Sequence, residues 1–290
     1  MTLIQTLVTP SHILQVSDRR LTYPDGRIAE DSHNKAVSWC AQLAFGFTGI
    51  AYVDCGQTKS VSEWIAETLL GAVDVEGGIE LIRRRAQDVV ARLPWLDKRL
   101  TIVATGFVDD AKWGCHPVTF VVSNFEYEDT IWPTHQDSFR RTIHFFPNEP
   151  HTRYFLRSGA KLSLQHERIV RRRIFPQAKR RVWDEVARRM IILQRFVSTT
   201  NVTVGRDSMV ISIPKNSTSP GTILTDVTSL GLTMETAGFS FVADGGLLPE
   251  RYGPHFVCGD SGFLDVKAKQ IGPNPGDQRM EVRIIKKADQ

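Results

Sequence analysis

The order of strand-like and helix-like segments is the feature that most constrains the fold of this chain. Residues 2–9 and 12–18 are rich in Leu, Ile, Val and Thr, and Pro10-Ser11 joins them. This pattern predicts two strands connected by a tight turn. Two more short strands are predicted over 35–40 and 42–48. The chain therefore opens with a cluster of predicted strands.

A pair of predicted helices follows this cluster. Apolar residues recur at three- and four-residue steps after Thr58 and Ser60, either of which can cap the start of a helix. A second helix is predicted over 78–93, and it ends before Pro94 because proline does not continue a helix.

The same alternation continues along the chain. Strand-like composition returns at 100–108 and 117–123, and helices are predicted over 163–174 and from Pro176 to Val197. A last core strand is predicted at 208–213. Strand clusters separated by helix pairs favour an α+β fold over alternating β-α units.

The composition changes after Pro214. Residues 216–221 resemble a linker, and the last 75 residues hold ten of the 21 glycines. We therefore expect a domain over 1–214 and a glycine-rich, β-rich extension over 215–290 that ends in a strand near 281–286. The sequence does not indicate a role for this extension.

Positive charge is concentrated in one segment. The net charge is +4, but residues 153–195 contain thirteen Lys or Arg and three acidic residues. Basic helices there could bind the phosphates of a nucleic acid. A solvated helix face or a contact between subunits explains the same charge. Aromatic side chains suited to base stacking are sparse in this segment, so a nucleic-acid partner is not expected.

Several classes of protein and site are not expected from the sequence. No apolar run is long enough to cross a bilayer, and the four cysteines are widely spaced, which is typical of a cytoplasmic protein with reduced thiols. The histidines show no metal-like pairing, so no metal or other cofactor is expected, and His12 and His33 are expected in surface turns. Cys258-Gly-Asp-Ser-Gly262 is similar to the nucleophile segment of trypsin-like proteases, but the predicted helices do not fit their fold, and we interpret it as a turn.

Thr2 is the most informative residue for function. Methionine aminopeptidase removes an initiator Met that precedes a small residue such as threonine. The mature chain would then begin with a hydroxyl and a free α-amine on one residue. The α-amine has a pKa near neutrality and can accept the hydroxyl proton, so a nucleophile and its base are combined.

Three downstream residues could complete such a site. Asp18 ends the second predicted strand and Lys35 begins another, so pairing of the first strands could bring both to Thr2. A lysine beside the nucleophile stabilises its alkoxide, and a carboxylate holds the lysine in place. Gly49 ends a predicted strand where a backbone N–H could point at an oxyanion. A strand-end salt bridge, an edge lysine and a turn glycine are the ordinary explanations of the same residues.

Together these residues resemble the proteasome β-subunit family, including its bacterial relatives. The resemblance comprises Thr2, the pattern Asp18-x-Arg20-x-Thr22, Lys35 and the Gly46-Phe-Thr-Gly49 turn before a helix, and it covers residues 2–214. It implies a four-layer αββα sandwich and a threonine-type N-terminal nucleophile hydrolase that cleaves peptide amide bonds.

The resemblance also implies roles for individual residues. Thr2 would be nucleophile and base, Asp18 and Lys35 would tune it, and the Gly49 amide would form the oxyanion hole. Substrate-binding roles fall on Thr22, Arg20 and Thr48. The implied partners are a peptide or protein substrate and further copies of the chain in a ring or stack. An ATPase partner is not identified by the sequence.

Two features depart from the family pattern. Lys35 lies one residue later than the usual spacing from the threonine. Asn201-Val-Thr-Val-Gly205 stands where the family often has Asp-x-x-Ser-Gly, so Asn201 lacks the charge and Val204 lacks the hydroxyl. A catalytically inactive scaffold or binding subunit of the same fold is therefore the alternative function.

Overall fold

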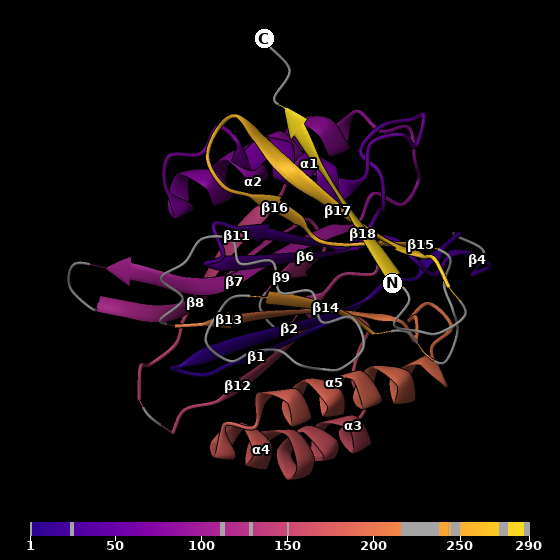
Figure 1. Ribbon diagram of the computed structural model, residues 1–290. Coiled ribbons are helices and arrows are strands. Elements are labelled where there is room, and N and C mark those ends of the chain that lie inside the picture. Colours follow the sequence, from indigo (N-terminus) through magenta and orange to yellow (C-terminus); the bar gives the residue numbers. More distant parts are fainter. Residues whose placement is uncertain are drawn as a thin grey trace.

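The computed structural model contains two large β-sheets and several helices (Figure 1). The described residues are 2–23, 26–110, 114–127, 130–149, 151–215, 238–242, 244, 250–272 and 278–286. Among the helices described, none is long and apolar enough to cross a membrane.

The first sheet has five strands in the order β12-β1-β2-β13-β14. Its members are β1 (Leu3–Val8), β2 (His12–Asp18), β12 (Tyr154–Gly159), β13 (Ser208–Pro214) and β14 (Gly238–Val242). β1 and β2 form the predicted hairpin, with Ile4 opposite Ser17. The start of β1 therefore lies beside the end of β2, where Asp18 is located.

The second sheet has nine strands in the order β11-β8-β7-β6-β5-β16-β17-β15, with β18 paired to β17. All neighbours are antiparallel except β5 and β16, which run parallel. The strands are β5 (Ala36–Trp39), β6 (Leu43–Gly49), β7 (Leu100–Asp110), β8 (Gly114–Ser123), β11 (Arg140–Phe145), β15 (Glu250–Tyr252), β16 (His255–Val257), β17 (Gly262–Gln270) and β18 (Gln278–Lys286).

Two further two-stranded ribbons flank the sheets. One pairs β3 (Leu21–Thr22) with β4 (Ile28–Glu30), and the other pairs β9 (Glu126–Tyr127) with β10 (Thr130–Ile131). The first ribbon contains Thr22 and connects Asp18 to Lys35.

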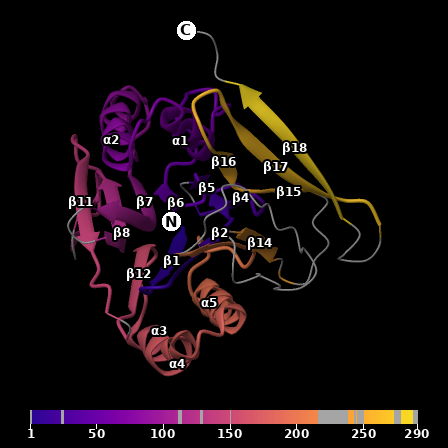
Figure 2. The same ribbon diagram turned by 60° about the vertical axis from the view of Figure 1, so that its left-hand side comes forward.

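Helices α1 (Val61–Leu69) and α2 (Val75–Ala91) pack on the nine-stranded sheet (Figures 1 and 2). Ser60 caps α1 through its hydroxyl, as predicted. The second helix begins earlier than its predicted start at residue 78, because the Asp74 side chain accepts a hydrogen bond from the Gly77 N–H and fixes the first turn there.

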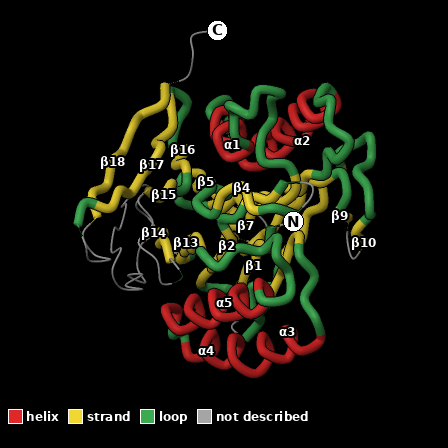
Figure 3. The backbone as a smooth tube through the Cα atoms, turned by 90° about the vertical axis from the view of Figure 1, so that its right-hand side faces the viewer, coloured by secondary structure: helices red, strands yellow, loops and turns green. Residues whose placement is uncertain are grey.

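The helices of the basic segment pack on the five-stranded sheet, on the opposite side of the molecule from α1 and α2 (Figure 3). They are α3 (Leu164–Ile169), a π-helical turn η1 (Val170–Ile174), α4 (Phe175–Arg180) and α5 (Trp183–Ser198). The prediction of one helix from Pro176 to Val197 is wrong, because Arg181 adopts a left-handed conformation with φ of 58° and separates α4 from α5.

The start of the basic segment is a strand rather than a helix. β12 pairs with β1 along its whole length, with Leu3 opposite Gly159. Its position at the sheet edge leaves its first four residues partly or fully exposed, so the apolar pattern expected of a core strand is weak.

A third apolar cluster lies where the two sheets meet. Val8 and Ile13 of the first sheet share it with Ala44 and Phe107 of the second. The prediction of a mixed α and β fold is confirmed. Strands from the 215–290 segment add to both sheets, through β14 on β13 and β16 on β5, and the predicted domain boundary at residue 214 stays a prediction.

Candidate functional site

Thr2 lies directly before β1 and is held by backbone contacts. It is buried, with 6% of its surface exposed. Its carbonyl accepts a hydrogen bond from the Ala160 N–H at 2.9 Å. Its hydroxyl accepts a hydrogen bond from Lys35 Nζ at 2.6 Å. A hydroxyl that accepts from an ammonium group can be stabilised as an alkoxide by the same contact.

Lys35 precedes β5 and is completely enclosed. Its Nζ lies within hydrogen-bond distance of three oxygens: Thr2 Oγ1, Asp18 Oδ1 at 3.2 Å and the carbonyl of Arg20. Burial lowers the pKa of Lys35 below its ordinary value, because the ammonium loses its hydration, while the Asp18 carboxylate opposes this shift. A lysine whose pKa is lowered exchanges a proton with a neighbouring hydroxyl more readily than an exposed lysine does.

Asp18 is the fixed centre of the site. The side chain is fully buried, and its Oδ2 accepts a hydrogen bond from the Leu3 N–H at 2.6 Å. Oδ1 accepts from the Arg20 N–H at 2.9 Å and the Gly205 N–H at 3.3 Å, in addition to Lys35. These donors come from four separate segments. Asp18 therefore ties the chain start, the lysine and the loop before β13 together.

The backbone N–H of Gly49 faces away from β7. Leu100, the residue opposite Gly49, donates its N–H to Asn124 Oδ1 and accepts the Asn124 N–H, so both of its polar groups point towards β8. Gly49 and Leu100 are thus a non-hydrogen-bonded pair, which directs the Gly49 N–H towards the β5 side of the sheet. Lys35 immediately precedes β5, so this geometry is compatible with an oxyanion donor at Gly49.

Gly159 and Glu126 also shape the site, and neither is identified by the sequence analysis. Gly159 has φ of 82°, and a Cβ at this position would lie 2.0 Å from the Thr2 carbonyl oxygen and 2.8 Å from Thr48 Oγ1. The Glu126 carboxylate accepts the Gly159 N–H at 2.8 Å and the Ser158 hydroxyl at 2.5 Å. A glycine at the end of a strand is the only sequence signal that marks this position, and Glu126 has none.

The predicted substrate-binding residues occupy three different environments. Thr48 is fully buried beside Gly159, and its hydroxyl has no hydrogen-bond partner among the described residues. The Arg20 guanidinium pairs with Asp31 at 2.6 Å and donates to the Val202 carbonyl at 3.0 Å, so internal contacts engage it. Thr22 is half-buried on β3. Among the described residues, no hydrogen bond joins these three side chains to the Thr2 hydroxyl.

The Asn201–Gly205 loop supports the site through its backbone. Asn201 Oδ1 accepts hydrogen bonds from the N–H and the hydroxyl of Thr203, so the asparagine stabilises its own turn. Val204 is fully buried in a small apolar cluster with Leu3. The two residues that depart from the family pattern thus position the Gly205 N–H, which reaches Asp18.

Both histidines expected in surface turns are buried, so that prediction is wrong. His12 is 2% exposed and stacks on Trp183 with ring centroids 4.4 Å apart, and burial lowers its pKa to about 3. His33 is 7% exposed. Within the described ranges, no three His, Cys, Asp or Glu side chains are arranged to hold a metal ion.

Cys258-Gly-Asp-Ser-Gly262 forms the turn between β16 and β17, as predicted. Gly259 has φ of 92°, and Cys258, Asp260 and Ser261 are exposed. In the basic segment, Arg171, Arg172 and Arg173 are exposed on η1. Nothing in their contacts indicates a ligand.

Comparisons with known proteins give a weak likeness at the level of the fold. No family model matches the chain, and no curated protein matches it. Among solved structures, a Gly-1 mutant of Anbu from Hyphomicrobium sp. strain MC1 is similar, with a TM-score of 0.46 and 14% identity over 73% of this chain and 80% of that chain. Anbu from Yersinia bercovieri, described as an ancestral beta-subunit, has a TM-score of 0.44 and 15% identity over 74% and 81%.

These findings correct the expected family. The predicted membership of the proteasome β-subunit family is wrong as an assignment, because no family model supports it and the similar structures are Anbu proteins. Both TM-scores lie below 0.5, a likeness too weak to place the chain in a family.

Proposed function

We propose that the chain is a threonine-type N-terminal nucleophile hydrolase that cleaves peptide amide bonds after removal of Met1. The observation that carries this proposal is the 2.6 Å hydrogen bond between Lys35 Nζ and Thr2 Oγ1, with the fully buried Asp18 behind the lysine. A buried Lys–Asp ion pair that contacts the Thr2 hydroxyl can stabilise the alkoxide of that hydroxyl. We interpret the two sheets and their outer helices as the four-layer αββα arrangement of such hydrolases.

The proposed reaction uses one residue as nucleophile and base. Removal of Met1 frees the Thr2 α-amine, which accepts the hydroxyl proton as Oγ1 attacks the carbonyl carbon of the substrate. The Gly49 N–H donates a hydrogen bond to the oxyanion that forms. The C–N bond then breaks, the leaving amine takes the proton from the α-amine, and an ester on Thr2 remains. Water hydrolyses this ester and restores the hydroxyl.

Lys35 and Asp18 keep the hydroxyl ready for attack. The Lys35 ammonium stabilises negative charge on Oγ1, and its lowered pKa reduces the free energy needed to move a proton within the site. Asp18 prevents the ammonium from turning away. Neither residue needs a metal ion or an organic cofactor for this role.

The peptide substrate is proposed to bind as an additional strand beside Thr22. β3 pairs with β4 on one side, and no strand in the described part of the chain pairs with its other edge. An extended peptide can add to such an edge through backbone hydrogen bonds. Backbone hydrogen bonds of this kind fit a peptide substrate and set no preference for its side chains.

A catalytically inactive scaffold is the second candidate. The observations that favour it are the small exposed fraction of Thr2, 6%, and the internal engagement of Arg20, which was expected to bind substrate. In this candidate the buried ion pair only fixes the chain start. Assembly with further copies of the chain is proposed for both functions.

Turnover of a fluorogenic peptide by the unmodified protein and two variants separates the two candidates. Thr2→Ala removes the hydroxyl and is expected to abolish turnover, whereas Thr2→Ser keeps a hydroxyl and is expected to retain measurable turnover. Circular dichroism should show both variants folded. Equal turnover by Thr2→Ala and the unmodified protein would exclude the mechanism, and absence of turnover in all proteins across a diverse peptide set would favour the scaffold.

A further inference from the structure

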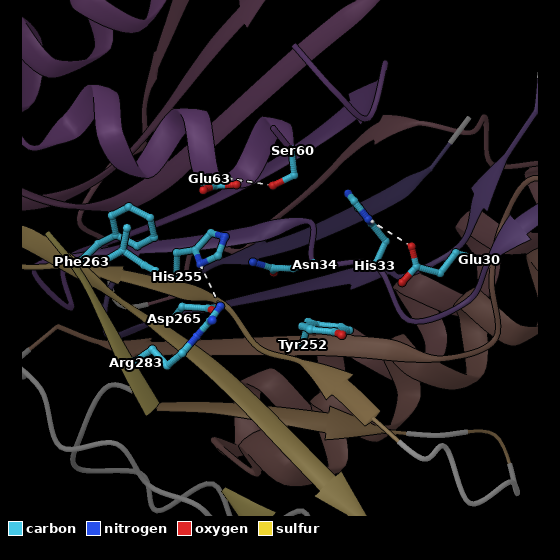
Figure 4. A pocket seen from close by; sticks show the side chains of 11 residues that line it. Glu30, His33, Asn34, Ser60, Glu63, Tyr252, His255, Phe263, Asp265 and Arg283 are labelled. Carbon is cyan, nitrogen blue, oxygen red and sulfur yellow. Dashed lines mark hydrogen bonds and ion pairs between the residues drawn. The ribbon is translucent and has the colours of Figure 1, made fainter. Parts of the chain in front are cut away.

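A pocket lies where β15, β16, β17 and β18 close over residues 30–34 and the start of α1 (Figure 4). Its volume is about 340 Å³. This lies at the lower end of the range of about 300–1,000 Å³ that is usual for small-molecule sites. Thr2 does not line the pocket, so the pocket is separate from the nucleophile.

The charged side chains that line the pocket are mostly acidic. Glu30, Glu63 and Asp265 contribute three carboxylates, and Arg283 contributes one guanidinium, which pairs with Asp265 at 3.0 Å. His255 adds no positive charge at neutral pH, because burial lowers its pKa to about 4. The pocket therefore has an excess of negative charge.

Glu63 is the carboxylate that remains without a partner. Glu30 accepts a hydrogen bond from the Ser32 hydroxyl and faces His33, and Asp265 faces Arg283. Within the described part of the chain, the Glu63 carboxylate forms no hydrogen bond or ion pair, and only its backbone N–H binds Ser60 Oγ, at 3.1 Å. Burial and the nearby Glu67 and Asp265 carboxylates raise its pKa above its ordinary value, although the Lys59 and Arg283 charges oppose this shift.

Two deeply buried polar groups in the pocket also lack partners. His33 and Asn34 are 7% and 6% exposed, and His33 Nε2 and Asn34 Nδ2 form no hydrogen bond with the described residues. Figure 4 shows the Asn34 amide pointing towards His255, and the second ring nitrogen of His33 turned away from Glu30. Buried polar groups are almost always paired, so these two atoms are available to a bound ligand.

The hydrogen-bonding character of these groups defines the ligand. His33 Nδ1 faces the Glu30 carboxylate at 3.4 Å, which places the ring proton on Nδ1 and leaves Nε2 as an acceptor. Asn34 Oδ1 accepts the Ala36 N–H at 3.0 Å, so its Nδ2 is a free donor. The pocket therefore offers acceptors at Glu63 and His33 and a donor at Asn34.

We propose that this pocket binds an organic cation, a primary ammonium or guanidinium group that donates to Glu63 and to His33 Nε2, with an oxygen nearby that accepts from Asn34. The ring of Phe263 in the pocket wall offers an apolar surface for the carbon part of the ligand. A metal ion fits less well, because the described residues contain no cluster of three ligating side chains. This assignment does not depend on the chemistry of Thr2.

The cation could come from a free small molecule or from a Lys or Arg side chain of a peptide. Isothermal titration calorimetry with n-butylguanidinium, with acetyl-Ala-Arg-Ala-amide and with n-butanol distinguishes these sources. We expect binding of at least one of the two cations and none of the neutral alcohol. Tighter binding of n-butylguanidinium assigns a free cation, and tighter binding of the peptide assigns a basic side chain.

Two variants test the residues. Glu63→Gln removes the unpaired charge and should weaken binding of the cation about tenfold or more, the usual effect of losing a hydrogen bond to a charged group. Glu76→Gln changes an exposed carboxylate on α2, away from the pocket, and should leave binding unchanged. Thr2→Ala should also bind normally, so a failed hydrolase proposal would leave this result intact. Equal affinity of Glu63→Gln and the unmodified protein, or no binding of either cation at millimolar concentration, would overturn the proposal.

Discussion

Removal of the Lys35 ammonium should destabilise the fold much more than removal of both charges of its ion pair. Lys35 and Asp18 have side chains that are 1% and 0% exposed, so neither charge is screened by water. Replacing one partner of a buried ion pair costs about 3–5 kcal/mol, because it leaves the other charge buried without compensation. Lys35→Met leaves Asp18 with only the backbone N–H donors of Leu3, Arg20 and Gly205. We therefore expect a loss of about 3–5 kcal/mol for this variant.

The double variant Lys35→Met/Asp18→Asn supplies the control. It removes both charges, and the asparagine oxygen can still accept the Arg20 and Gly205 N–H groups, although the Leu3 N–H loses its acceptor. Its stability should therefore recover part of the loss. Urea denaturation followed by circular dichroism at neutral pH gives the free energy of unfolding of all three proteins. A loss below about 1 kcal/mol for Lys35→Met, the range of a solvent-exposed pair, would refute the buried ion pair.

Three other perturbations test separate features. Gly159→Ala should abolish peptide turnover and lower stability, because its Cβ would meet the Thr2 carbonyl at 2.0 Å, whereas Gly114→Ala has positive φ and open space and should keep turnover. Glu126→Ala should reduce turnover without abolishing it, because Gly159 loses the acceptor of its N–H; unchanged turnover would show that this contact does not position the site. The neutral form of His12 stabilises the fold fully above its unfolded pKa of 6.5, and this contribution is lost as pH falls towards its folded pKa of about 3. At pH 5 the loss is about 2 kcal/mol. Urea denaturation should therefore show that the free energy of unfolding depends less on pH for His12→Gln than for the unmodified protein. An equal pH dependence for the two proteins would contradict this reasoning.

The contacts among Thr2, Asp18 and Lys35 could be predicted because these residues are close in sequence. Residues 12–18 form a strand with the predicted bounds, and its pairing with β1 necessarily places Asp18 near Thr2. Only the short β3–β4 ribbon separates Lys35 from Asp18 in the sequence. A hairpin of this kind is specified by local pattern and turn chemistry, so the sequence contains most of the information needed to position these three side chains.

The residues from distant segments could not be predicted in the same way. Gly159 and Glu126 reach the site only because β12 pairs with β1, and nothing in the local composition of a charged edge strand specifies that partner. The parallel pairing of β16 with β5 is likewise a long-range contact. The burial of His12 depends on Trp183, about 170 residues away, so no local pattern distinguishes it from a histidine in a surface turn.

Both the proposed mechanism and the proposed substrate class require that Thr2 becomes an N-terminal nucleophile. Intact mass spectrometry after incubation with a threonine-directed β-lactone tests this directly. We expect a chain that lacks Met1 and carries one adduct, which peptide fragmentation places on Thr2 and which Thr2→Ala does not form. A chain that keeps Met1 and carries no adduct would contradict the account.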